Sequence, residues 1–313
     1  MNDFIINLIP IKRFREKFKR IAAEKKRLIW EHTGSAEFAR EKYIKPLINN
    51  QFEKFDIQPK KDLETDKIIW QYWGQGISDE TPKIVKKCLE SVEKHKGQYQ
   101  VIFLTNENIK EYLDIPDFVT NKLNNNPEFT VTLFSDLLRL ILLNTYGGIW
   151  IDATIYLTDE ISKKYTEQDF FVFQRTPKPV FSARWVNYNR GYFNWEKYHK
   201  VNMLNSFMVS KKHYPLTEIL QTLLLNYWKN EDKIQHYFFT QILFNELMEY
   251  DEYNKYNCKK VSDLIPHEMQ LNMYKPYTQK LWNNLTKSNS IHKLTYWLKP
   301  IPQNSILDKI LND

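Results

Sequence analysis

The stretch FSDLLRLILLNTYGGIWIDATIYLT (residues 134–158) decides the fold. Apolar side chains recur at helical spacing before the two glycines, which predicts a helix over residues 130–146. Gly147 and Gly148 end that helix and allow the chain to reverse tightly. The apolar run 149–157 then predicts a strand, so this stretch is typical of an α/β domain.

Flanking segments extend this α/β pattern in both directions. KIIWQYW (67–73) and QVIFLT (100–105) are predicted strands, and the amphipathic segment between them is a predicted helix that begins at Thr81-Pro82. This strand–helix–strand unit predicts a parallel pair with a right-handed crossover. The remaining predicted elements are short helices over 106–113 and 116–123, strands over 170–174 and 207–209, a long loop over 175–200, and helices over 215–228 and 237–249.

Composition narrows the class of protein. The chain has 313 residues and two cysteines, Cys88 and Cys258, so no disulfide framework is indicated and a reducing compartment is expected. The formal net charge is +7, and residues 1–30 carry nine basic and three acidic side chains, or +6 of that total. A nucleic-acid enzyme usually spreads basic charge along a groove, so no nucleic-acid partner is expected.

The N-terminal segment has the pattern of a basic amphipathic helix, interrupted or begun at Pro10. Lys and Arg are interleaved with apolar residues at roughly helical spacing, namely Phe4, Ile5, Leu8, Ile9, Ile11, Phe14, Phe18 and Ile21. Such a segment suits an anionic membrane surface, although a solvated helix packed on the domain remains the alternative. No apolar run approaches the roughly 20 residues that span a bilayer, and no secretory leader is recognised. We expect a cytoplasmic protein, peripheral on the inner face of the membrane, with an arm over 1–65 and one domain over 66–313.

Three charged residues form the candidate site. Asp136 and Arg139 are three apart on the predicted helix and therefore share one face. Asp152 lies in an otherwise apolar strand, where an unpaired carboxylate would be costly. A divalent cation that bridges a diphosphate would satisfy it, since Mg²⁺ and Mn²⁺ favour oxygen ligands. The alternative is a surface ion pair and an unrelated strand-end carboxylate.

These motifs resemble a known family. The segments IIWQYWGQG (68–76), TPKIVKKCLESV (81–92), VIFLTNENIKEYL (101–113), residues 134–158, NSFMVSKKHYP (205–215) and IHKLTYW (291–297) are similar to bacterial capsular polysaccharide synthesis glycosyltransferases. Those belong to a wider group of DXD-type retaining glycosyltransferases. The resemblance implies a GT-A (Rossmann-like) nucleotide-sugar-binding domain with helical C-terminal additions, a nucleotide-sugar donor (a UDP-sugar is expected), Mn²⁺ or Mg²⁺, and retention of anomeric configuration.

The resemblance also implies roles for individual residues. Gln71, Tyr72 and Trp73 would line the base and ribose pocket, and Ser135, Asp136 and Arg139 would contact ribose, donor sugar or diphosphate. The same reasoning assigns the remaining donor contacts to Gly147, Gly148, Trp150, Asn205 and Ser206.

The metal motif departs from the wider group. Asp152 matches the first acid of Asp-x-Asp, but Thr154 stands where the second acid is expected. The expected metal ligands are therefore Asp152, Thr154 and the more distant His292, with Lys293 beside the leaving diphosphate. A segment of the family often begins with an acidic residue, and in this chain His236 stands at that position. Glu231 and Asp232 are alternative acidic residues for contact with the acceptor, and the sequence does not rank them.

The function implied is sugar transfer to a lipid-linked glycan in capsular or cell-surface polysaccharide synthesis. The basic arm would hold the protein at an anionic membrane. The alternatives are a nucleotide-sugar hydrolase, a toxin-like transferase that acts on protein, or a carbohydrate- or membrane-binding scaffold that has lost catalysis.

Overall fold

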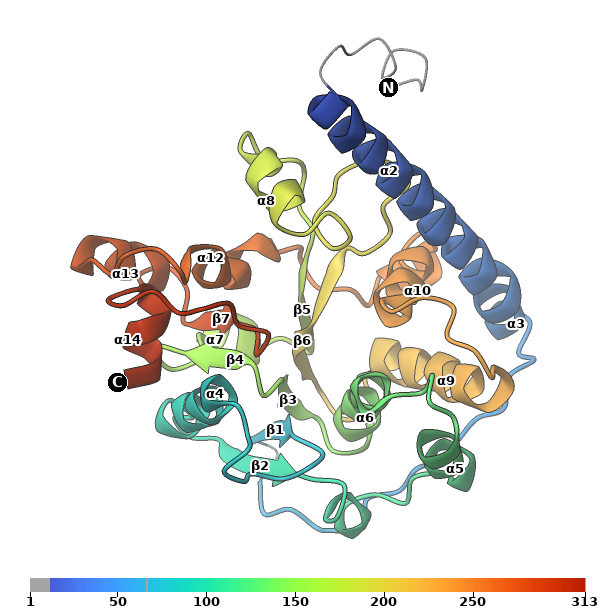
Figure 1. Ribbon diagram of the computed structural model, residues 1–313. Coiled ribbons are helices and arrows are strands. Elements are labelled where there is room, and N and C mark those ends of the chain that lie inside the picture. Colours follow the sequence, from blue (N-terminus) through green and yellow to red (C-terminus); the bar gives the residue numbers. More distant parts are fainter. Residues whose placement is uncertain (1–11, 66, 313) are drawn as a thin grey trace.

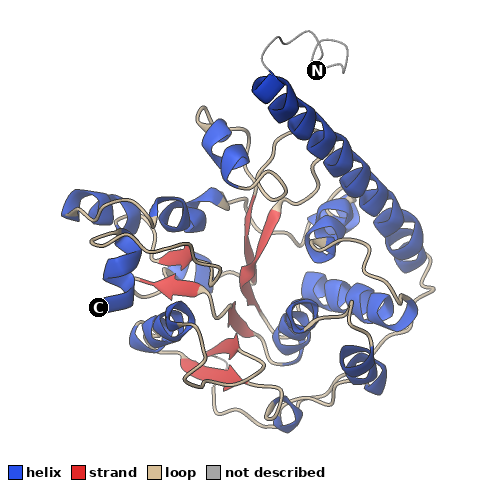
Figure 2. Ribbon diagram, viewed as in Figure 1, coloured by secondary structure: helices blue, strands red, loops and turns tan. Residues whose placement is uncertain are grey.

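A five-stranded mixed sheet forms the centre of the computed structural model, which describes residues 12–65 and 67–312 (Figure 2). Its strand order is β2-β1-β3-β6-β5. The strands in that order are β2 (Gln100–Leu104), β1 (Ile68–Tyr72), β3 (Gly148–Ile151), β6 (Met203–Ser210) and β5 (Phe170–Gln174). β1 is parallel to β2 and β3, whereas β6 is antiparallel to β3 and β5. The predicted α/β class and the predicted parallel pair are confirmed.

The predicted strand over 149–157 is two strands in two sheets. β3 ends at Ile151, and β4 (Ile155–Leu157) pairs with β7 (Ile291–Lys293) in a separate two-stranded sheet. A tight turn separates β3 from β4, closed by the hydrogen bond that the Ile155 amide donates to the Asp152 carbonyl over 2.9 Å. Both halves are apolar, so the hydrophobic pattern alone does not reveal the break. Its consequence is that Asp152 leaves the sheet rather than lying within it.

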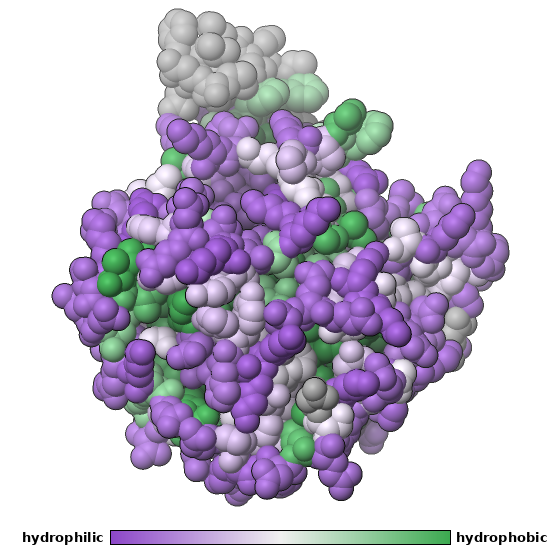
Figure 3. All heavy atoms as spheres, turned by 180° about the vertical axis from the view of Figure 1, so that it is seen from behind, coloured by the Kyte–Doolittle hydropathy of each residue, from purple (hydrophilic) through white to green (hydrophobic). Residues whose placement is uncertain are grey.

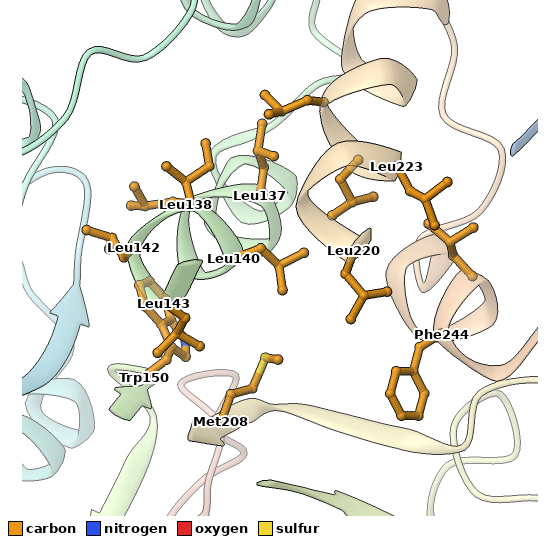
Figure 4. Packing of buried hydrophobic residues seen from close by; sticks show 14 of the residues in the cluster. Leu137, Leu138, Leu140, Leu142, Leu143, Trp150, Met208, Leu220, Leu223 and Phe244 are labelled. Carbon is orange, nitrogen blue, oxygen red and sulfur yellow. The ribbon is translucent and has the colours of Figure 1, made fainter. Parts of the chain in front are cut away.

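Helices cover both faces of the large sheet. Val92 of α4 (Lys83–Lys94) packs with Ile69 and Ile149 on one face. Alternate strand residues face the other way, and there Trp70 and Trp150 pack against α6 (Val131–Thr145). Leucines of α6 face those of α9 (Pro215–Asn230), and α10 (Phe239–Leu247) adds Phe244 to the same core (Figure 4). The predicted helix after Thr81-Pro82 and those over 130–146, 215–228 and 237–249 are therefore present.

Gly147 and Gly148 are required by the turn from α6 into β3. Both have positive φ, +77° and +101°. A Cβ atom on Gly147 would lie 2.7 Å from the Lys212 amide nitrogen, and one on Gly148 would lie 2.6 Å from the Ile68 carbonyl oxygen. Protein backbone thus occupies the space beside both glycines, at the end of β3 opposite to Asp152. The predicted turn is confirmed, and the expectation that the two glycines approach a ligand stays a prediction.

The remaining elements lie around this core (Figure 1). They are η1 (Arg40–Ile44, a π-helical turn), α3 (Lys45–Ile48), η2 (Ile109–Glu111), α5 (Asp117–Asn125), α7 (Lys163–Thr166), α8 (Ser182–Tyr188), α11 (Asp251–Asn254), α12 (Leu264–Asn272), α13 (Gln279–Thr286) and α14 (Ile306–Asn312). Three sequence predictions need correction. The helix expected over 106–113 is only η2, the expected loop 175–200 contains α8, and the strand expected at 207–209 begins at Met203.

The helix α2 (Lys12–Ala39) extends along one side of the molecule (Figure 1). Its second half packs on the domain through buried residues such as Leu28 and Ala36, whereas Phe14, Phe18 and Trp30 are exposed. Seen from behind, the surface is mainly hydrophilic with scattered hydrophobic patches (Figure 3). Within residues 12–65 and 67–312, no helix is both long and apolar enough to span a membrane. The predicted apolar positions from Phe4 to Ile11 lie outside the described residues.

Candidate functional site

Asp152 lies directly beyond the carboxyl end of β3, where ligands of open α/β sheets usually bind. Its backbone amide donates to the Ser206 carbonyl of β6 over 2.9 Å, which holds the residue beside the neighbouring strand. The Trp150 indole Nε1 donates to Asp152 Oδ1 over 2.7 Å. The Asp152 side chain is 21% exposed. Asp152 is therefore fixed by protein contacts but open to solvent on one side.

Arg139 is the buried centre of the cluster. Its Nη2 lies 3.0 Å from Asp136 Oδ1 and 3.4 Å from Asp152 Oδ1. Nη1 donates to the Asn205 carbonyl over 2.6 Å, and Nε and Nη2 donate to the carbonyl and hydroxyl of Ser135, both over 3.0 Å. The guanidinium also lies over the Trp150 ring, 5.1 Å from its centroid. With 3% of its surface exposed, Arg139 orients the two carboxylates and does not face solvent.

Asp136 is held from three sides. Its Oδ1 accepts a hydrogen bond from Asn205 Nδ2 over 2.9 Å, and its Oδ2 accepts one from Thr240 Oγ1 over 3.2 Å. The third contact is the ion pair with Arg139. The sequence pattern had placed Asn205 and Ser206 before the strand, but both residues lie within β6. Thr240 is the second residue of α10 and was not predicted; the only signal was the family-like segment that contains His236.

The two carboxyl groups differ in their electrostatics. Burial raises the pKa of Asp136, the charge of Asp152 raises it further, and Arg139, Thr240 and Asn205 offset part of this. Burial also acts to raise the pKa of Asp152, but Arg139, Lys293, Trp150 and Ser206 outweigh it and lower this pKa to about 2. Asp152 is therefore ionised throughout the physiological pH range.

Lys293 adds a second cation to the cluster. β7 pairs with β4 so that Lys293 lies opposite Ile155. Its Nζ lies 3.4 Å from Asp152 Oδ2 and donates a hydrogen bond to Thr154 Oγ1. The Lys293 side chain is 20% exposed, similar to that of Asp152. The cluster therefore holds two carboxylates and two cations, and Lys293 is the cation that faces solvent.

His292 does not join this cluster. Successive residues of a strand point to opposite faces. In β7 the Lys293 side chain points toward Asp152, so the His292 side chain points away from it. His292 Nε2 instead lies 3.0 Å from Thr158 Oγ1, and the residue is fully buried. Burial lowers its pKa to about 3, so it is neutral. The predicted metal ligand set of Asp152, Thr154 and His292 is not brought together.

The residues present at Asp152 do not fit a divalent metal site. Asp152 is the more exposed of its two carboxylates, and Arg139 and Lys293 already contact the two Asp152 oxygens. The Thr154 hydroxyl accepts from Lys293. Within residues 12–65 and 67–312, no group of three or more His, Cys, Asp or Glu side chains could hold a metal ion.

The end of β1 forms the next part of the site. Gln71 is buried, and its Nε2 has no hydrogen-bond partner, which is uncommon for a buried amide. The Tyr72 hydroxyl donates to Asn106 Oδ1 over 2.5 Å. Trp73 is half-buried, with its ring 5.7 Å from that of Tyr296 in an edge arrangement. Trp73 therefore remains accessible to a ligand, whereas the Gln71 amide is enclosed and the Tyr72 hydroxyl is already bonded.

Exposed aromatic side chains surround the cluster. Trp297 is 78% exposed and lies beside Tyr296, with the ring centroids 5.1 Å apart. Tyr237 is 57% exposed. Burial raises the pKa of Tyr237, and the nearby charges of Asp136 and Asp152 and the Tyr296 hydroxyl raise it further. We name Trp73, Tyr237, Tyr296 and Trp297 the aromatic rim. The sequence motif IHKLTYW included two of them, but their position was not predicted.

The acids considered for the region around α10 lie elsewhere. Glu231 accepts from the Tyr43 hydroxyl over 2.8 Å, and Asp232 lies 3.4 Å from the Lys122 ammonium. The His236 ring lies against His32, with 5.1 Å between their centroids. The contacts of these three side chains do not include Asp136, Arg139 or Asp152.

Comparisons with known proteins agree with the sequence motifs. A family model described as "Capsular polysaccharide synthesis protein" matches residues 21–310. O-glycosyltransferase braB from Annulohypoxylon truncatum is 31% identical over 110 residues, which cover 32% of this chain and 26% of that protein. The chain thus matches about a quarter of the length of this curated relative.

Two solved structures are also similar. One is the "PaToxG Glycosyltransferase", with a TM-score of 0.35 and 16% identity over 87% of this chain and 99% of that one. The other is a glycosyltransferase involved in the glycosylation of the major capsid of PBCV-1, with a TM-score of 0.36 and 10% identity over 79% and 100%. At these TM-scores, neither likeness bears on the function of this chain.

Proposed function

Because this chain belongs to the capsular polysaccharide synthesis protein family, we propose that it is a glycosyltransferase that uses a nucleotide-diphosphate sugar, with UDP as the favoured nucleotide. The observation that carries the proposal is the Asp136–Arg139–Asp152 cluster at the carboxyl end of β3, with Lys293 at its open side. An ionised, rigidly held cluster at this edge of an α/β sheet is a common place for a phosphorylated ligand.

The donor would occupy the edge that β1, β3 and β7 share. Its base would lie against Trp73 and Tyr296, where aromatic faces are available for stacking. The diphosphate would contact Lys293, whose ammonium faces solvent and is fixed by Asp152 and Thr154. The rest of the aromatic rim would then face the sugar and the acceptor.

In the reaction, an acceptor hydroxyl oxygen forms a bond to the anomeric carbon while the bond from that carbon to the diphosphate oxygen breaks. Negative charge develops on the leaving diphosphate, and Lys293 stabilises it. Asp136 and Asp152 are both held by Arg139 and by hydrogen bonds, so neither is free to serve as nucleophile or base. The acceptor proton would pass to the departing phosphate oxygen on the same face, which fits the retention of configuration that the family resemblance implies.

The buried Arg139 would act as a positioning residue. Its contacts to Ser135 and the Asn205 carbonyl fix the guanidinium, and the guanidinium fixes both carboxylates. A change at Arg139 would therefore alter the geometry of the cluster rather than remove a direct ligand contact.

The proposal is tested by incubating the protein with radiolabelled UDP-sugars and a membrane extract that contains lipid-linked glycans. We expect release of UDP and label in the organic-extractable fraction. Label in polypeptide would indicate a toxin-like transferase, and release of free sugar alone would indicate a hydrolase. A protein that neither binds nucleoside diphosphates nor releases them would contradict the proposal and favour a non-catalytic scaffold.

We further propose that the first half of α2 contacts an anionic membrane surface, which brings the enzyme to a lipid-linked acceptor. Lys17, Lys19 and Arg20 are exposed on this half, together with Phe14 and Phe18. Each cation near anionic lipid contributes about 1 kcal/mol. Charge reversal at Lys17, Lys19 and Arg20 should release the full-length protein from phosphatidylserine vesicles, while Lys211→Glu should not. Unchanged sedimentation of the triple variant with vesicles would overturn this role.

A further inference from the structure

The ammonium of Lys293 occupies the place between Asp152 and Thr154. Sequence comparison with the wider DXD-type group leads one to expect a second acid at Thr154 and a metal ion between the two side chains. In this chain, Lys293 Nζ hydrogen-bonds Thr154 Oγ1 and lies 3.4 Å from Asp152 Oδ2. A cation of the protein itself thus lies where a bound cation would be expected.

The charges balance without a metal ion. Two carboxylates and one divalent cation carry no net charge. Asp152 and Lys293 together likewise carry no net charge, because the Thr154 hydroxyl is neutral. Asp152 with the Lys293 ammonium therefore presents the same net charge to a diphosphate as two carboxylates with a divalent ion. A divalent ion bound in addition would lack the second carboxylate that normally compensates its charge.

Backbone pairing fixes Lys293 in this position. β7 pairs with β4, and the Leu294 amide donates to the Thr154 carbonyl over 2.8 Å. Thr154 and Lys293, whose side chains are hydrogen-bonded to each other, thus also lie on adjacent, paired backbone segments. His292 is anchored on the opposite face by Thr158, which prevents β7 from rotating. Lys293 is therefore not a surface lysine that reached Asp152 by chance.

We propose that this protein binds and uses its nucleotide-diphosphate donor without a divalent metal ion, because the Lys293 ammonium replaces it. The inference rests on the proposed function, since it specifies how the same site holds the diphosphate. Lys293 supplies the positive charge that stabilises the leaving group, and Asp152 and Thr154 hold that charge in place.

The first test measures the Kd of uridine diphosphate by calorimetry on the full-length protein, once with excess EDTA and once with Mn²⁺. We expect the two Kd values to agree within about three-fold. A Kd at least ten-fold weaker in EDTA would overturn the inference. The absence of binding in both buffers would instead contradict the proposed function, so the two failures are distinguishable.

The second test uses variants with thermal unfolding as the check of folding. Lys293→Ala should weaken uridine diphosphate binding in EDTA by at least about ten-fold, as expected for the loss of a charged hydrogen bond. Lys211→Ala removes an exposed lysine that pairs with Asp169 and should leave the Kd unchanged. Binding by Lys293→Ala equal to that of the wild type would overturn the assignment. If Lys293→Ala does not fold, Lys293→Gln keeps the chain length and the same two outcomes apply.

A double variant reverses the substitution. Thr154→Asp with Lys293→Ala restores two acids and removes the ammonium, so we expect uridine diphosphate binding that requires Mn²⁺. Binding by the double variant that remains independent of Mn²⁺, or that is absent in both buffers while the protein folds, would count against a cation position between residues 152 and 154.

Discussion

Among the described residues, two buried arginines pair with aspartates, and the two clusters differ in their exposure to solvent. Arg175 makes a bidentate contact with Asp263, with Nε to Oδ1 at 2.9 Å and Nη2 to Oδ2 at 2.7 Å, and Asp263 is fully buried. Arg139 pairs with Asp136 and Asp152, and Asp152 is partly exposed and also meets Lys293. The first pair is closed and the second is open.

The contacts of the closed pair, Arg175 and Asp263, are all with other parts of the protein. Carbonyl groups of Tyr192 and Asn194 accept the remaining Arg175 donors, and aromatic rings, including Trp195, surround the guanidinium. One charge neutralises the other, and nothing is left for a ligand. A buried ion pair is therefore not in itself a functional site. What distinguishes the Arg139 cluster is a second carboxylate and a second cation at its solvent-facing side.

The largest expected effect separates the two clusters by activity. Asp152→Asn removes the charge that holds Lys293 while Asp136 still neutralises Arg139. We expect donor turnover to fall by about a hundred-fold or more, the usual cost of a misplaced electrostatic group, in a protein that still unfolds cooperatively. Turnover assays on protein normalised by thermal unfolding provide the measurement. Wild-type turnover in Asp152→Asn would remove the cluster from the mechanism.

The matched change in the closed pair should affect stability instead. Asp263→Asn leaves the Arg175 charge buried without a counter-charge, and breaking such a pair costs about 3 to 5 kcal/mol. We expect Tm to fall by about 6 °C or more, with the Kd for uridine diphosphate unchanged in the protein that remains folded. A variant with normal Tm but lost donor binding would show that the Arg175 cluster is functional and that the comparison is wrong.

A smaller effect is expected from acid. His199 and His267 hydrogen-bond the carbonyls of Tyr192 and Asp263 around Arg175, and burial lowers their pKa values to about 3 and about 4. The unfolded chain, with histidine pKa values near 6.5, binds more protons between pH 6.5 and 4. Stability should therefore decrease as pH falls through this window.

The Asp152 carboxylate should not titrate in the same window. The pKa of Asp152 is lowered to about 2, so its charge persists. Thermal unfolding and donor binding measured from pH 7 to pH 5 should diverge, with a falling Tm and a constant Kd in the folded protein. A Kd that weakens while Tm stays constant would place the titrating group at the donor site.

The sequence predicts the part of the candidate site that comes from residues close together in the chain. Asp136 and Arg139 are three residues apart on a strongly apolar helix, so their shared face follows from helical spacing. The turn after α6 follows from Gly147 and Gly148. Contacts between segments distant in sequence were not accessible. Arg139 meets the Asn205 carbonyl 66 positions away, and this contact depends on the register of β6 against β3.

The two errors in the site have the same cause. The run 149–157 has no break in hydrophobicity, because β3 and β4 are both buried, so the turn at Asp152 was not visible. Whether His292 or Lys293 faces that turn depends on the pairing of β7 with β4, and the three-residue strand β7 is too short to show a hydrophobic period. The sequence analysis placed both His292 and Lys293 at the site, and only Lys293 reaches Asp152.

The most direct test of a metal-free donor site is the position of the two phosphate groups in a crystal grown with uridine diphosphate and EDTA. We expect a phosphate oxygen within hydrogen-bonding distance of Lys293 Nζ, beside Asp152 and Thr154, with the base against Trp73. A nucleotide bound at another surface, or a diphosphate that leaves Lys293 paired only with Asp152 and Thr154, would contradict it.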